Sequence, residues 1–261
     1  SAGDYQWHTF YGSNDMEQCG GMAVEASGNV YVTGYSRADW VGPNVSSPLH
    51  SRAAGEASNA EIFVVKLDTN GGYLWHTFYG SGIDEYSNAV AVDSGGNCYV
   101  TGESYAAWNG PGSTLPLNGF VAGDQDIFVL ALDTAGAYRW HTFYGSSDYD
   151  TGAGITVDTS GSLCVVGTSY ASWQGPGDVS PLNDHAGQYE IAMLKLDSAG
   201  AYLWHTFFGG SGAEDGYSIT HDADGNLYAC AGGNWTWLGP DSTAPLHDHT
   251  VTVGVDILVV A

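Results

Sequence analysis

The sequence predicts an all-β fold, a closed four-bladed β-propeller in which each blade is a four-stranded antiparallel meander. The main observation is a repeat, because the string Trp-His-Thr-Phe recurs four times and divides the chain into four units of 64 to 68 residues. Within each unit, short runs rich in Val, Ile, Tyr and Thr alternate with Gly-containing turns. The repeated string begins at Trp7, Trp75, Trp140 and Trp204.

Four strands are expected in the first complete unit, and each is short and bounded by turn residues. Five-residue connections join the first strand to the second and the third to the fourth, so both pairs are hairpins. A longer loop containing the motif Trp-x-Gly-Pro joins the second strand to the third. The expected strands are 22–26, 30–35, 62–67 and 73–79.

Ring closure is expected from the two ends of the sequence. Residues 5–11 have the pattern of a fourth strand and residues 256–261 that of a third strand, so the first can complete the last blade. Closure would remove exposed sheet edges. The chain is then one domain, a monomer with units 12–79, 80–144, 145–208, and 209–261 plus 1–11. A linear solenoid and a half-ring that dimerises into eight blades are the structural alternatives.

Residues 88–102 and 126–133, followed by the Trp140 strand, resemble the bacterial β-propeller repeats known as SBBP repeats. This resemblance extends over essentially the whole chain, once in each unit. It implies that the first strand of each unit is innermost, and that the chain is secreted or exposed on a bacterial surface. The family has no shared catalytic set, so the resemblance implies a fold and no activity.

Charge and composition limit the partners. Five Lys and Arg residues stand against 29 Asp and Glu residues, a formal charge of −24, which excludes a nucleic-acid partner because phosphates need clustered basic side chains. No apolar run is long enough for a membrane-spanning helix. The four cysteines show no disulfide or zinc spacing, so we expect buried free thiols.

Acidic residues recur at two positions of each unit, and with the first strand innermost, as the resemblance implies, both fall on the face where the long loops emerge. Carboxylates and turn carbonyls are ligands of Ca²⁺, so they form a candidate cation site, whereas the alternative is that they accept hydrogen bonds from backbone N–H groups in turns. The first column is Glu17, Glu85, Asp150 and Glu214, and the second is Glu61, Asp126, Glu190 and Asp256.

The tryptophans of the Trp-x-Gly-Pro loops are candidate carbohydrate platforms, since an exposed indole beside a carboxylate suits a sugar. The alternative is that each indole fills a gap between blades. The fourth loop differs from the others because it adds Trp235 and a histidine pair, His247 and His249, too few for a zinc site. The four loop tryptophans are Trp40, Trp108, Trp173 and Trp237.

No nucleophile motif or catalytic pair can be identified, so the sequence predicts a non-enzymatic binding or structural module without an organic cofactor. Its partner is expected to be a carbohydrate or a protein on the loop face. A lectin with repeated tryptophan sites is the first alternative. A hydrolase on the same face is the second, and it predicts one deep asymmetric pocket.

Overall fold

The chain forms an all-β structure of propeller-type sheets. The structure is a computed structural model and describes residues 3–53, 59–249 and 254–261. Three sheets have four antiparallel strands in chain order and the last has three. They are β1 (Glu17–Val24), β2 (Val30–Ser36), β3 (Glu61–Leu67) and β4 (Tyr73–Tyr79); β5 (Glu85–Val92), β6 (Cys98–Ser104), β7 (Asp126–Leu132) and β8 (Tyr138–Tyr144); β9 (Asp150–Val157), β10 (Leu163–Ser169), β11 (Glu190–Leu196) and β12 (Tyr202–Phe208); and β13 (Glu214–His221), β14 (Leu227–Gly233) and β15 (Asp256–Val260).

Three of the four predicted strands of the first unit are confirmed to within one residue at each end, whereas the first, expected at 22–26, is Glu17–Val24. The first strand begins earlier than expected, at Glu17, because a bulge after Cys19 lets its polar start stay paired with β2. In the first hairpin of the second sheet, Asp93 holds the turn by accepting the backbone N–H groups of Gly95 and Asn97.

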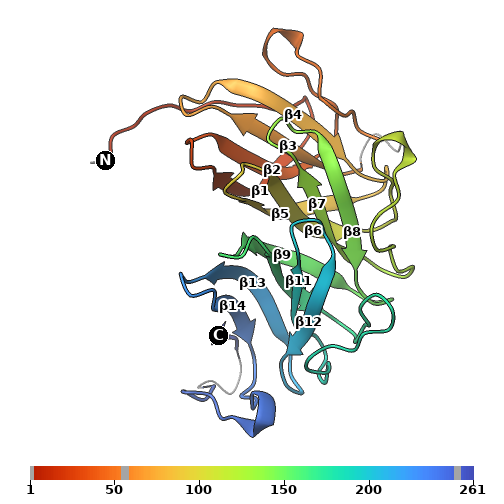
Figure 1. Cartoon of the computed structure of the whole chain (residues 1–261), viewed down its shortest axis with the longest axis vertical. Helices are drawn as coiled ribbons and strands as arrows, with labels where there is room; N and C mark the ends of the chain where they lie inside the picture. Colours follow the sequence, from red (N-terminus) through yellow and green to blue (C-terminus); the bar gives the residue numbers. More distant parts are fainter. Residues whose placement is uncertain (1–2, 54–58, 250–253) are drawn as a thin grey trace.

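The sheets fan out from a column of inner strands, in which β1 packs on β5, β5 on β9 and β9 on β13 (Figure 1). The backbones approach closely in this column. A Cβ atom on Gly154 of β9 would lie 3.0 Å from the Cα of Ser218 in β13. The first strand of each unit is therefore the innermost, as the resemblance implied.

Packing between sheets makes the interior. Every residue of β7 is buried, because both faces of the second sheet are covered by neighbouring sheets. Side chains of β15 alternate between half-buried and exposed, since the fourth sheet has a neighbour on one face alone. The core is thus continuous through the middle of the arc and thins toward its two ends.

The Trp-x-Gly-Pro loops run over the outside of the sheets. Each turns sharply after its proline, and three contain a 3-10 turn with a left-handed residue such as Gly112, at φ 67°. The 3-10 turns are η1 (Pro43–Val45), η2 (Pro111–Ser113) and η3 (Pro240–Ser242). None of the helices in the described ranges is long and apolar enough to cross a membrane.

The expected ring closure is not present. Residues 5–11 form no strand, and the sheet of β13, β14 and β15 has no fourth strand among the described residues. The first and fourth sheets lie at opposite ends of an open arc (Figure 1). The reason is that residues 5–11 are attached to the first sheet, where Tyr11 packs against Trp40 and Tyr73.

The cysteine prediction is half right. Cys98 and Cys164 are buried free thiols, whereas Cys19 and Cys230 are free and exposed. The difference follows from the open arc, because Cys19 and Cys230 lie in the two end sheets, each of which lacks a neighbouring sheet on its outer face.

Candidate functional sites

The two predicted acidic columns meet in pairs between neighbouring sheets. In the middle pair, Asp126 at the start of β7 and Asp150 at the start of β9 are both fully buried. They meet beside Gly145, where a Cβ atom would lie 2.5 Å from Asp126 Oδ1 and 2.9 Å from Asp150 Oδ2. The equivalent pairs are Glu61 with Glu85 at Gly80, and Glu190 with Glu214 at Gly209.

Each carboxylate of the middle pair also holds a loop. Asp150 accepts the backbone N–H of Ser146 at 2.6 Å and its hydroxyl at 2.8 Å, and Asp126 Oδ2 accepts the N–H of Val121 at 2.6 Å. Asp126 Oδ1 has no hydrogen-bond partner among the described residues. Burial and the neighbouring charge of Asp150 raise the pKa of Asp126 to about 7. Burial raises the pKa of Asp150 to about 6, against its hydrogen bonds.

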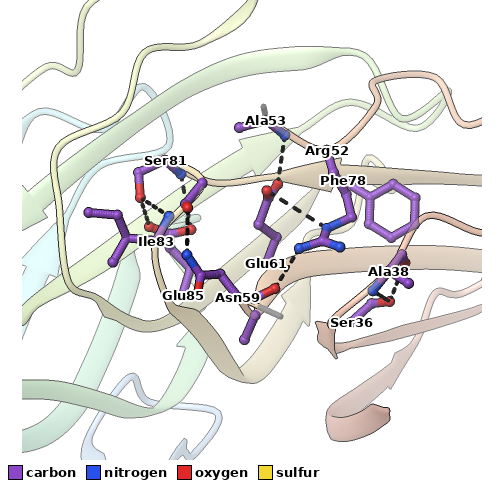
Figure 2. Close-up of polar contacts among 12 residues, drawn as sticks. Ser36, Ala38, Arg52, Ala53, Asn59, Glu61, Phe78, Ser81, Ile83 and Glu85 are labelled. Atoms are coloured by element: carbon purple, nitrogen blue, oxygen red, sulfur yellow. Dashed lines mark hydrogen bonds and ion pairs between the residues drawn. The ribbon is translucent and has the colours of Figure 1, made fainter. Parts of the chain in front are cut away.

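Figure 2 shows the first pair, Glu61 and Glu85. It differs from the middle pair because a cationic side chain, that of Arg52, lies beside it. Glu61 Oε2 accepts the backbone N–H of Ala53 at 3.0 Å, and Arg52 Nε lies 3.7 Å from its Oε1. Glu85 accepts hydrogen bonds from the N–H and hydroxyl of Ser81. Burial raises the pKa of Glu85 to about 7, with a further contribution from the charge of Glu61.

The other two members of the columns, Glu17 and Asp256, lie in the two end sheets. Glu17 is half-buried and accepts hydrogen bonds from the hydroxyls of Ser13 and Ser36. Asp256 is partly exposed, and its Oδ2 lies 3.9 Å from Nε2 of His249. The structure thus brings six of the eight predicted acids together, and leaves one at each end of the arc. The described residues hold no cluster of three or more metal-ligating side chains.

Three of the four loop tryptophans fill gaps in the protein and do not present an indole face to solvent. Trp108 is 4% exposed and stacks on the ring of His141 at 3.8 Å between centroids. The repeated sugar platforms predicted at these positions are therefore absent, because a buried face cannot stack on a sugar. Trp40 and Trp173 are buried on His76 and His205 in the same way.

The stacked histidines have both ring nitrogens engaged. His141 Nε2 lies 3.0 Å from the carbonyl oxygen of Trp108, which can only accept, so Nε2 carries the proton. Nδ1 then accepts from the hydroxyl of Tyr138 at 2.8 Å. Burial lowers the pKa of His141 to about 4, which agrees with a neutral ring. These histidines join each loop to its outer strand.

The fourth unit is the exception. Trp237 is half-buried, Trp235 is 65% exposed, and both lie with His247 and His249 along a groove of about 1170 Å³ beside β15. Ile257 and Val259 of β15 point exposed apolar side chains outward. The sequence analysis singled out this loop but missed the groove, because the groove depends on how the loop packs beside β15 in the tertiary structure.

The sequence analysis also missed the glycines that lie next to the acid pairs. Gly145 precedes Asp150 by five residues, and the same spacing holds in every unit, so the signal was in the sequence. Its meaning depends on the tertiary contact with Asp126 from another strand. The glycines at this position are Gly12, Gly80, Gly145 and Gly209.

Comparisons with known proteins give a distant relationship. The chain is 24% identical over 279 aligned residues to an uncharacterised WD repeat-containing protein of Acanthamoeba polyphaga mimivirus, over 92% of this chain and 20% of that protein. It therefore spans about a fifth of the length of that relative. With the four repeated sheets, this relationship supports a repeat fold of the β-propeller type. No family model matches the chain, so the resemblance to the SBBP repeats stays a prediction.

Two solved structures are similar in part. A protein of unknown function from Bacteroides caccae has a TM-score of 0.41 and 11% identity, covering 88% of this chain and 60% of that one. A glucose dehydrogenase has a TM-score of 0.33 and 13% identity, covering 80% of this chain and 78% of that one. Both scores are below 0.5, so neither structure bears on the fold or function of this chain.

Proposed function

We propose that this chain is a non-enzymatic scaffold of propeller-type sheets that binds a partner by accepting an extended strand in the groove beside β15. The observation that carries the proposal is a groove of about 1170 Å³ with exposed apolar side chains beside the outer edge of β15, where the described residues supply no further strand. Backbone hydrogen bonds to such an edge supply affinity, and alternate side chains of the added strand supply specificity.

The repeated polar groups support a structural assignment for the rest of the chain. Both ring nitrogens of His141 are hydrogen-bonded, one to Tyr138 and the other to the Trp108 carbonyl, so the ring has no free lone pair or proton for a substrate. Asp126 and Asp150 hold loops between sheets. Because three sheets carry equivalent groups in equivalent contacts, their common role is to fix the fold. The extracellular or bacterial surface location stays a prediction from the resemblance.

A labelled peptide tests the proposed function. Residues 4–13 of this chain, Asp-Tyr-Gln-Trp-His-Thr-Phe-Tyr-Gly-Ser, have the sequence that fills the fourth position in the other sheets. Fluorescence anisotropy of this peptide should show saturable binding to the chain. The matched peptide with Pro in place of Thr9 should bind at least about tenfold more weakly, because proline disrupts strand pairing. Equal binding of the two peptides, or no binding of either, would reject the proposal.

Cation binding at the acid pairs is a second candidate function. It is favoured by Asp126 Oδ1 and Glu214 Oε1, buried carboxylate oxygens that have no hydrogen-bond partner among the described residues. A Ca²⁺ ion would satisfy such oxygens and offset the charge of each pair. The melting temperature at pH 8 should then be higher in millimolar Ca²⁺ than in EDTA, and Asp126→Asn should reduce that difference. An unchanged melting temperature would exclude this role.

A further inference from the structure

A row of tyrosine rings crosses one edge of the first three sheets. Tyr35 near the end of β2 and Tyr86 near the start of β5 meet edge to face, with their ring centroids 4.8 Å apart. The centroid of Tyr86 lies 6.1 Å from that of Tyr105, which follows β6. In the third sheet, Tyr170 contacts two further tyrosines at 5.5 Å and 4.7 Å. The tyrosine band consists of Tyr35, Tyr86, Tyr105, Tyr149, Tyr170 and Tyr189.

The middle of the band is open to solvent where the second and third sheets meet. Tyr105, Tyr149 and Tyr170 are 39%, 40% and 40% exposed. The backbone N–H of Tyr105 donates to the carbonyl of Asp84, and that of Tyr170 to the carbonyl of Tyr149, so these rings share one edge of the sheets. Burial raises the pKa of Tyr105 to about 12, and the neighbouring Tyr149 adds to the rise. One ligand can therefore touch rings of both sheets.

The band does not follow the sequence repeat. Groups that hold the fold recur at one position of each unit, as His76, His141 and His205 do. Tyr149 stands one residue before the acid that begins an inner strand, and the other units have no tyrosine there. The residues at that position are Met16, Asp84 and Ala213. Packing of the repeat therefore does not require these tyrosines, and they are available for another role.

Carboxylates lie beside the rings of the band. Burial raises the pKa of Tyr170, and the nearby charge of Asp215 raises it further. Burial and the charge of Asp215 raise the pKa of Tyr189 as well. Burial and the charge of Asp84 have the same effect on Tyr86. A carboxylate next to an aromatic face attracts a cation twice, through its charge and through the quadrupole of the ring.

The protein already holds cations of its own in this way. The ammonium of Lys66 lies 4.6 Å from the ring centroid of Tyr31 and 3.1 Å from a carboxylate oxygen of Glu25. Arg37 lies beside Tyr86, where its charge opposes the rise in pKa that burial causes. The chain has five Lys and Arg residues, and four of them contact groups outside the band. Those four are Arg52, Lys66, Arg139 and Lys195.

We propose that the tyrosine band binds an extended, arginine-bearing segment of a partner protein, with guanidinium groups on the tyrosine rings and one of them paired with Asp215. A guanidinium is planar, so it can stack on a ring and donate to a carboxylate at the same time. The charge of −24 attracts a basic segment. Because the rings extend over three sheets, an extended segment fits them better than a small cation. This surface is separate from the groove beside β15.

The geometry of the rings favours a cation over a sugar. Tyr35 and Tyr86 are perpendicular, at 90°, and Tyr149 and Tyr170 are inclined at 45°. A sugar polymer stacks best on rings that form a flat platform, whereas a guanidinium needs a single face and a nearby carboxylate. Tyr170 and Asp215 supply both.

Fluorescence anisotropy tests the proposal with a labelled peptide of four Gly-Arg repeats and the full 261-residue chain. The peptide should bind saturably, and its affinity should fall as salt is added. A matched peptide with citrulline at each arginine keeps the planar group but has no charge. It should bind at least about tenfold more weakly. Equal binding of the two peptides, or no binding of either, would overturn the proposal.

Ring substitutions distinguish the band from the overall charge of the chain. Tyr105→Leu and Tyr170→Leu each remove an exposed ring of a different sheet without changing the charge, and each should weaken binding by about fivefold. Tyr170→Phe should retain binding. Tyr228→Leu is the matched control, because Tyr228 is 37% exposed and donates to the carboxylate of Asp222 outside the band. If all four variants bind like wild type, general charge attraction explains the contact and the proposal fails.

A charge substitution and a sugar complete the test. Asp215→Asn should weaken binding, whereas Asp241→Asn removes the same charge from the exposed turn η3 and should leave it unchanged. Equal losses in the two variants would overturn the pairing with Asp215. Calorimetric titration with maltohexaose should show no binding. If maltohexaose binds and Tyr170→Leu abolishes that binding, while the arginine peptide does not bind, the band is a sugar site and the proposal is wrong.

Discussion

Glu85→Gln should make the stability of this protein less dependent on pH. Glu85 is fully buried beside Glu61, with Arg52 on the far side of Glu61, and its pKa is raised from 4.5 to about 7. The folded chain therefore keeps a proton that the unfolded chain loses. The stabilisation from this proton is fully present below pH 4.5, and it is lost as the pH rises toward 7.

The size of the effect follows from the shift. At about 1.4 kcal/mol for each pKa unit, the folded wild type should lose about 3 kcal/mol of unfolding free energy between pH 4.5 and pH 8 through Glu85. A glutamine does not ionise, so the variant should be less stable than wild type, or equal to it, at pH 5 and more stable at pH 8. Urea unfolding at pH 5, 6, 7 and 8 measures the difference.

A control separates this local effect from the overall charge. Asp241→Asn removes the same unit of charge from the exposed turn η3, so it reports the effect of overall charge without a buried carboxylate. If Glu85→Gln changes stability by the same amount at every pH, the buried pair does not hold a proton. The explanation for the raised pKa would then be wrong.

Three further predictions concern the repeated contacts. His141→Ala should destabilise the chain by about 2 to 4 kcal/mol in urea unfolding, because it removes the stack on Trp108 and leaves buried polar groups without partners; a loss below 1 kcal/mol would contradict this. Gly145→Ala should lower the melting temperature, since the new methyl group meets Asp126 and Asp150, whereas Gly119→Ala adds a methyl group in open space; comparable melting temperatures would refute the close approach. A thiol reagent should label two cysteines in the folded chain and four after unfolding, the first two being Cys19 and Cys230.

The repeat made most of the fold predictable. Each repeat unit folds into an antiparallel sheet of strands in chain order. Its hairpins are fixed by local residues, such as those of the Asp93 turn, and by the alternation of apolar side chains. The pairing of the acid columns was less predictable. Their recurrence was visible in the sequence, but whether Asp126 meets Asp150 depends on how two sheets pack.

The environment of the loop tryptophans could not be predicted from the repeat either. Trp108 and Trp237 occupy the same position of the repeat, and one is buried while the other lines a groove. The sequence alone could not distinguish them, since the buried indole stacks on a histidine from an outer strand, and the described residues supply no such strand to the fourth sheet.

By itself, the sequence determined the number of units, the strands within them and the residues that recur, because turns and hairpins depend on short-range contacts. Only the tertiary structure decided that the described sheets form an open arc and that the acids meet in buried pairs. These outcomes depend on the angle at which each sheet packs on the next, which is set by many side chains together and by no single motif.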